Sequence, residues 1–151
     1  MKIFWKKCAV TLIAAVLGSA AFAAEGWGDN YENALKQAKE EKKQVLAIFS
    51  GSDWCPPCKY LDANILSKKD FQDEAQKDFV LLFVDFPRRK KLDGAVVKQN
   101  AELARKYRIN AYPTIKILDA EGKELKSQVG LPKGSKNVKT FLKWLKNASG
   151  K

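Results

Sequence analysis

The feature that most limits the fold of this chain is a pair of apolar runs of strand length, separated by helical sequence. Val45 to Phe49 is apolar throughout, and Phe79 to Phe86 is apolar except for Asp85 near its end. Such continuous runs are typical of strands that are covered on both faces. Strands that are separated by helices pair in parallel, since the helix returns the chain to the starting edge. The sequence therefore predicts a buried parallel pair.

A hairpin is predicted in the second half of the chain. Thr114 to Leu118 alternates polar and apolar residues, as a strand with one covered face does. Asp119 to Gly122 has turn composition, and Glu124 to Val129 follows as the partner strand. The hairpin adds an antiparallel part, so we expect a mixed sheet.

Helices are expected on both sides of these strands. We predict them at 29–42, with Asp29 and Glu32 as a capping box, from about Pro57 to about Leu66, and at 70–77 and 99–108. Ser135 is expected to cap a last helix whose apolar face carries Val138, Phe141, Leu142 and Leu145. The fold class is α/β, with a mixed central sheet flanked by helices.

The first 23 residues are typical of an export signal. Lys2, Lys6 and Lys7 precede an apolar core from Cys8 to Leu17, and Ala21-Phe22-Ala23 has the small-x-small pattern of a cleavage site. The alternative is an uncleaved anchor, but the core is shorter than the ~20 residues of a membrane span. We expect residues 1–23 to be a signal peptide and 24–151 one domain, periplasmic or secreted after cleavage near Ala23.

The cysteine pattern points to redox chemistry. The chain has three cysteines, and removal of Cys8 with the signal leaves only Cys55 and Cys58. At i,i+3 helical spacing their Cα atoms lie roughly 5 to 6 Å apart, within the range of a disulfide. A bridge over three residues restricts the unfolded chain very little, so stability is a poor reason for it. The chain has no histidine, and two cysteines supply only half of a structural zinc site, so we expect no metal and no cofactor.

A helix that begins at about Pro57 would make Cys55 the reactive thiol. A helix N-terminus lowers the pKa of a nearby thiol through its dipole and free N–H groups. We expect Cys55 to be the exposed nucleophile and Cys58, in the first turn, the buried resolving thiol. Pro113, after Tyr112, opens a predicted strand, and its peptide bond could be cis or trans. Trp27, Trp54 and Tyr112 could line a docking patch around Cys55.

The chain resembles the thioredoxin family. The resemblance rests on Val45 to Phe49, the segment Trp54-Cys55-Pro56-Pro57-Cys58-Lys59, Asp85, Ala111-Tyr112-Pro113-Thr114, Gly122 and Gly130. It is similar above all to exported members such as the C-terminal domain of the disulfide reductase DsbD. The resemblance implies a thioredoxin-like fold, a cis Pro113 facing the cysteines, and substrate binding by Trp54, Tyr112 and Pro113.

The sequence departs from thioredoxin itself at three places. Its first strand has no buried acid, so Asp53 is either a substitute or a solvated loop residue. The residues between the cysteines are Pro-Pro, not Gly-Pro, and Arg88 to Lys91 lengthens the loop after the second strand.

We expect a thiol-disulfide oxidoreductase that reduces or exchanges protein disulfides through a mixed disulfide. Pro56 and Pro57 supply no donor to a thiolate, which favours a reductase over a disulfide-forming oxidase. The alternative class is a non-enzymatic binding module on the same scaffold. The net charge of +11 permits acidic partners or a membrane surface, but a solvated lysine face is the simpler interpretation. We expect protein disulfide substrates, a membrane or soluble thiol electron donor, no nucleic acid, and a monomer.

Overall fold

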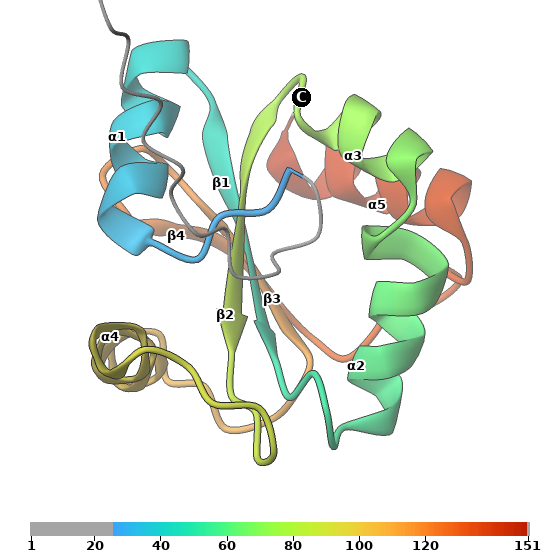
Figure 1. Ribbon diagram of the computed structural model, residues 1–151. Helices are drawn as coiled ribbons and strands as arrows, with labels where there is room; N and C mark the ends of the chain where they lie inside the picture. The colour runs from blue at the N-terminus through green and yellow to red at the C-terminus, as the bar shows by residue number, and fades with distance from the viewer. Residues whose placement is uncertain (1–25, 151) are drawn as a thin grey trace, which may run out of the picture.

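The computed structural model describes residues 26–150 and consists of a four-stranded mixed sheet between two helical layers (Figure 1). The proposed signal peptide, residues 1–23, lies outside the described residues. The elements follow in the order α1 (Tyr31–Glu41), β1 (Gln44–Ser50), α2 (Pro56–Leu61), the π-helical turn η1 (Asp62–Leu66), α3 (Lys69–Ala75), β2 (Phe79–Asp85), α4 (Gly94–Lys106), β3 (Thr114–Leu118), β4 (Glu124–Val129) and α5 (Val138–Ser149). This order confirms the predicted one. Between residues 26 and 150, no helix has the length and apolar character needed to cross a membrane.

The strand order β2-β1-β3-β4 brings three chain segments together at one end of the sheet. β1 and β2 are parallel with Ser50 opposite Asp85, so both strands end there. β3 runs antiparallel to β1 with Thr114 opposite Phe49, so it begins at that same end. In Figure 1 this is the lower end, where the chain enters α2. The predicted mixed sheet is confirmed, and its lower end is the place where loops converge.

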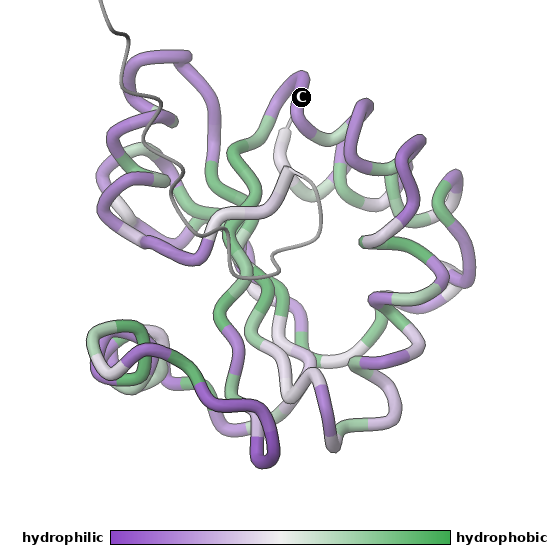
Figure 2. Tube along the Cα trace, in the orientation of Figure 1, coloured by the Kyte–Doolittle hydropathy of each residue, from purple (hydrophilic) through white to green (hydrophobic). Residues whose placement is uncertain are grey.

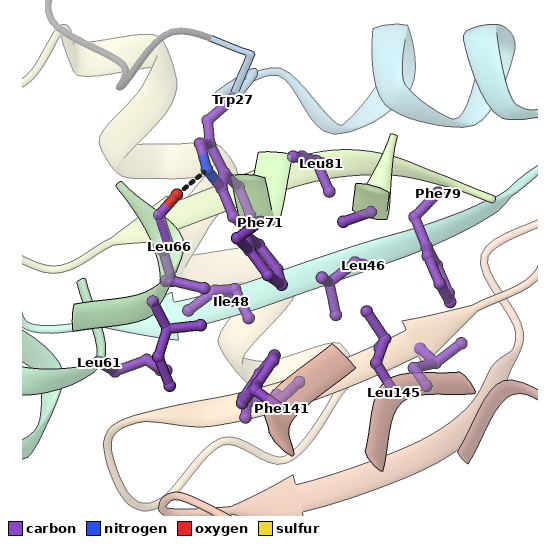
Figure 3. Packing of buried hydrophobic residues seen from close by; sticks show 14 residues of the cluster. Trp27, Leu46, Ile48, Leu61, Leu66, Phe71, Phe79, Leu81, Phe141 and Leu145 are labelled. Atoms are coloured by element: carbon purple, nitrogen blue, oxygen red, sulfur yellow. Dashed lines mark hydrogen bonds between the residues drawn. The ribbon is translucent and has the colours of Figure 1, made fainter. Parts of the chain in front are cut away.

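Alternate residues of the strands supply two cores. One core lies between the sheet and α2, α3 and α5, and contains Leu46, Ile48, Leu61, Ile65, Leu66, Phe71, Phe79, Leu81, Phe141 and Leu145 (Figure 3). The other lies between the sheet and α1 and α4, and contains Tyr31, Ala38, Val45, Ala47, Phe49, Val80, Leu82, Val84, Leu103 and Tyr107. In Figure 2 β1 and β2 are hydrophobic along most of their length, whereas the helices alternate between hydrophobic and hydrophilic residues. Burial on both faces explains why β1 and β2 were recognisable as unbroken apolar runs.

Trp27 belongs to the first core and not to a docking patch. Its side chain is 6% exposed, its ring stacks near Phe71, and its Nε1 donates to the Leu66 carbonyl at 3.3 Å (Figure 3). The prediction that Trp27 lines a surface around Cys55 is therefore wrong. The next residue, Gly28, forms a parallel bridge with Leu82 in the edge strand β2, which holds this segment against the sheet and the indole in the interior.

β3 is also buried on both faces, contrary to its alternating pattern. It lies between β1 and β4, and all five of its residues are buried, including Lys116 at 6% exposure. The ammonium group reaches Glu124 Oε2 at 2.7 Å, which compensates its removal from water. A buried, paired lysine is indistinguishable in sequence from a solvent-facing one.

The predicted starts of α1, α4 and α5 differ from the structure in their capping residues. Asn30, not Asp29, is the N-cap of α1, and its side chain accepts the N–H of Asn33. Asn137, not Ser135, caps α5, in a capping box with Thr140. α4 begins at Gly94, five residues before the predicted start, after the N-cap Asp93. Before α1 and α5 more than one residue has a capping side chain, and only the folded backbone selects between them.

Candidate functional site

The two cysteines lie where the chain turns from β1 into α2. The turn is closed by Gly51, whose carbonyl accepts the N–H of Trp54 at 3.2 Å and of Cys55 at 2.9 Å. Cys55 is the N-cap of α2, and the helix begins at Pro56, one residue earlier than predicted. Pro56 and Pro57 both fit there, since the N–H groups of a first turn have no partner within the helix.

Cys55 and Cys58 form a disulfide with their Cα atoms 5.2 Å apart, as the spacing predicted. Two backbone N–H groups point at the sulfur atoms. Cys58 N–H donates to Cys55 Sγ at 3.3 Å, and Gly51 N–H donates to Cys58 Sγ at 3.5 Å. A donor that faces a sulfur stabilises the thiolate more than the thiol. The helix start is therefore arranged to support a thiolate at Cys55 once the bridge is opened.

Both cysteines are buried in this disulfide-bonded state. Cys55 is 4% exposed and Cys58 2% exposed. The expectation of an exposed Cys55 is wrong for this state, because the bridge holds its sulfur against the first turn of α2. The expectation of a buried Cys58 is confirmed. A partner protein that exchanges with this disulfide must therefore first contact the residues around it.

Trp54 is held in place by contacts with two segments, the loop after β2 and the turn at Gly51. Its Nε1 donates to the Phe86 carbonyl at 2.7 Å, and the Arg88 guanidinium lies over its ring, 3.9 Å from the ring centroid. Gly51 lies directly against the ring. A Cβ atom added at that position would be only 2.5 to 2.7 Å from indole atoms. The indole of Trp54 can therefore occupy this position only because Gly51 has no side chain.

Tyr112 completes an aromatic patch next to the disulfide loop, formed by Trp54, Phe86 and Tyr112. The Tyr112 ring lies 5.8 Å from the Trp54 ring and 5.2 Å from the Phe86 ring, and all three residues are half-buried. Burial raises the pKa of Tyr112, so the patch is uncharged near neutral pH. The Tyr112–Pro113 bond is cis, as the resemblance implied, and Pro113 is buried at the start of β3, beside the end of β1.

Asp53 holds the loop after β2. Its carboxylate accepts the backbone N–H groups of Arg88 at 2.9 Å, Arg89 at 2.6 Å and Lys90 at 3.0 Å. These donors, Arg88 first, lower the pKa of Asp53 to about 2. All of these contacts hold the loop in place. Asp53 is therefore neither a substitute for the buried acid of thioredoxin nor a merely solvated residue.

The buried acid of this region is Asp85, at the end of β2. It is 8% exposed, and its carboxylate accepts the Ser52 N–H at 3.0 Å and the Ser52 hydroxyl at 2.6 Å. Asn100 of α4 donates to its backbone carbonyl at 2.9 Å. Asp85 therefore ties the loop before the cysteines to the second strand.

Sequence reasoning missed Gly51, Ser52 and Phe86 as parts of this site. A glycine directly after a buried strand often marks a close approach of another group, and that signal was present for Gly51. Ser52 and Phe86 had none, since their roles depend on a partner more than thirty residues away. Within residues 26–150, no group of three or more acidic, cysteine or histidine side chains could hold a metal ion.

Sequence and structure comparisons place the chain among known proteins. The family model described as a thioredoxin-like domain matches residues 31–149. A protein named disulfide bond reductase DsbH, of Chlamydia pneumoniae, is 32% identical over 97 residues, which are 64% of this chain and 58% of that protein. The thioredoxin-related protein DsbJ of the same organism is 32% identical over 99 residues, 66% of this chain and 28% of its own length. The chain thus spans from about a quarter to about three fifths of these relatives.

Solved structures show the same architecture. A structure described as DsbH oxidoreductase superposes with a TM-score of 0.72 at 30% identity, covering 81% of this chain and 82% of that one. The oxidised C-terminal domain of DsbD from Neisseria meningitidis gives 0.54 at 19% identity, covering 77% and 90%, which is a likeness of fold alone. The family match over residues 31–149 includes every helix and strand described above, and the chain belongs to the thioredoxin-like domain family.

Proposed function

We propose that this protein is a thiol-disulfide oxidoreductase that works mainly as a reductase of protein disulfides. The observation that carries the proposal is the Cys55–Cys58 disulfide at the N-terminus of α2, with Cys55 as the N-cap. A bridge of this kind opens and closes with little backbone movement. The relatives named disulfide bond reductase and thioredoxin-related protein support the same activity.

The reaction is two successive exchanges of sulfur partners. The Cys55 thiolate attacks one sulfur of a partner disulfide, which forms a mixed disulfide and releases the partner's other sulfur as a thiolate. The Cys58 thiolate then attacks Cys55 Sγ, which forms the Cys55–Cys58 bond and releases the partner's second thiolate. Two electrons have passed to the partner, whose thiolates take up protons from water. A dithiol donor, soluble or in a membrane, reduces the pair again by the reverse exchanges.

The residues around the pair suggest how a substrate is held. Trp54 and Tyr112 offer apolar, uncharged faces to the segment that flanks a substrate cysteine. In this proposal the backbone of Tyr112, two residues before β3, pairs with an extended substrate chain, and Pro113 belongs to the same binding segment. We further propose that the protein is exported by cleavage near Ala23, acts in the periplasm or outside the cell, and is a monomer.

A Cys58→Ser variant tests the proposal directly. Without the resolving thiol the mixed disulfide through Cys55 accumulates, and mass spectrometry of the trapped complexes identifies substrates. A Cys55→Ser variant is the matched control and should trap nothing. Wild-type protein should also accelerate the precipitation of insulin by dithiothreitol. A binding module without redox activity would give neither the complexes nor the acceleration.

The reduction potential of the Cys55–Cys58 couple decides the direction. The proposal predicts a potential nearer to that of thioredoxin, about −270 mV, than to that of DsbA, about −120 mV. Equilibration with glutathione buffers, followed by alkylation and mass spectrometry, measures it. A value close to that of DsbA would identify a disulfide-forming oxidase in place of a reductase.

A further inference from the structure

The loop between β2 and α4 carries a run of four basic residues, Arg88 to Lys91, at the end of the sheet where the cysteines lie. We name this run the basic loop. All four side chains are exposed, and Figure 2 shows this segment as strongly hydrophilic at the lower end of the molecule. A charge run on a loop is most often only solvated, so its significance depends on how it is held.

The basic loop is fixed to the cysteine motif by two kinds of contact. Asp53 binds three successive backbone N–H groups, those of Arg88, Arg89 and Lys90. The Arg88 guanidinium stacks on the ring of Trp54, the residue next to Cys55. Stacking uses only the face of the guanidinium, so the N–H donors in its plane remain free to bind a carboxylate in the two-point geometry that arginine favours.

The acidic groups nearby are turned toward the protein. The Asp53 carboxylate accepts N–H groups of the basic loop, and that of Asp93 accepts the Ala95 N–H at the start of α4. Asp85 is buried against Ser52. In the part of the chain that the structure describes, no ion pair involves a side chain of the basic loop. The charge that this surface presents outward is therefore positive.

A pocket of about 410 Å³ lies beneath the basic loop. Phe86, Pro87, Leu92 and Val97 give it apolar walls, and Lys90 and Lys91 also line it. Val97 is 52% exposed, so an apolar group is accessible there without a covering partner among the described residues. Phe86 belongs both to this pocket and to the aromatic patch, so the pocket adjoins the patch that contains Trp54, the residue before Cys55.

We propose that the basic loop and this pocket form a docking site for an acidic segment of the partner protein. A carboxylate next to the partner cysteine binds Arg88, an apolar side chain enters the pocket, and further carboxylates pair with Lys90 and Lys91. This inference rests on the proposed function and adds the substrate class: disulfides flanked by acidic residues. An anionic membrane is less suited, because the partner must bring a disulfide to Cys55 beside the same surface.

Two synthetic cystine peptides test the proposal, one with glutamates flanking the cysteines and one with glutamines. Each carries a quenched fluorophore pair released on reduction, with dithiothreitol as electron donor. Wild-type protein should reduce the acidic peptide with a kcat/KM about fivefold higher at low salt, since charges at the rim of an interface act mainly on the association rate. The preference should vanish at roughly 0.5 M salt, where the screening length falls to a few ångströms.

A pair of double variants separates local from overall charge. Lys90→Gln with Lys91→Gln should reduce the preference to about twofold or less. Lys36→Gln with Lys39→Gln removes the same charge from exposed positions on α1, at the opposite end of the sheet, and should leave the preference unchanged (Figure 1). Equal rates for both peptides with wild-type protein, or equal losses in both variants, would overturn the proposal.

A binding measurement keeps this result distinct from a failure of the proposed function. The acidic peptide, with its cysteines replaced by serine, is titrated into ¹⁵N-labelled protein. The Arg88 Nε–H, the Trp54 indole N–H and the amides of residues 89–92 should shift, whether or not the protein has reductase activity. Shifts with phosphatidylglycerol vesicles but none with the peptide would overturn the proposal in favour of a membrane surface.

Discussion

Gly51→Ala is the substitution that tests most sharply how the site is built. The added Cβ would lie 2.5 Å from Trp54 Cε2 and 2.7 Å from Cζ2 and Nε1. An ordinary contact is at least 3.4 Å, so the indole would have to move by roughly 1 Å. That movement strains the Nε1 hydrogen bond to the Phe86 carbonyl and the contacts with Arg88 and Tyr112.

The expected loss in the free energy of unfolding is about 1 to 3 kcal/mol, the usual cost of overpacking. The lost hydrogen bond contributes about 1 kcal/mol of it. The cost stays within this range because Trp54 is half-buried and has room to move outward. The Gly51 backbone is outside the positive-φ region, so the effect is steric and carries no backbone strain.

Urea unfolding of the oxidised protein, followed by far-UV circular dichroism, measures the change. Gly94→Ala is the matched control: nothing lies within 4 Å of its Cβ position, and it begins α4. That variant should be unchanged or more stable by up to about 1 kcal/mol, because alanine suits a helix better than glycine. A Gly51→Ala protein as stable as wild type, with an unshifted Trp54 indole N–H signal, would refute the account of how Trp54 is positioned.

Two further predictions concern pH and the core. The pKa of Asp53 is lowered to about 2 from its ordinary 3.8, so its hydrogen bonds to the basic loop are complete above about pH 4 and are lost as the pH falls through about 2. The amide chemical shifts of residues 88–90 in an acid titration should follow that range. An apparent pKa near 4 would contradict this prediction. Phe141→Ala, at a fully buried position, should lower the free energy of unfolding in urea by about 3 to 5 kcal/mol. Val97→Ala, at a position 52% exposed, should change it by no more than about 0.5 kcal/mol. Equal effects of the two substitutions would contradict the assigned core.

The sequence was sufficient for the order of elements and for the cysteine pair. Val45 to Phe49 and Phe79 to Phe86 were recognisable as strands because burial on both faces leaves a continuous apolar run. The Cα separation of the cysteines followed from helical spacing alone. Both properties are local, so the residues concerned carry their own signal.

The contacts that position the site could not be predicted in this way. Asp53 binds a loop that begins thirty-five residues later, and Trp54 donates to Phe86, thirty-two residues later. Lys116 has the sequence character of a solvent-facing residue but lies in an inner strand. All of these contacts depend on the order and direction of the strands. The parallel pairing of β1 and β2, for example, brings the loops that follow both strands to one end of the sheet. Only the three-dimensional arrangement contains that information.

The most direct test of the account is the pKa of the Cys55 thiol in the reduced protein. Iodoacetamide alkylation rates from about pH 5 to pH 10, with the labelled residue identified by mass spectrometry, report it. The position of Cys55 at the helix start, facing the Cys58 N–H, predicts that Cys55 is labelled first and that its pKa lies below the ordinary value of a free thiol. Labelling of Cys58 first, or a Cys55 pKa at the ordinary value of about 8.5, would contradict the central claim.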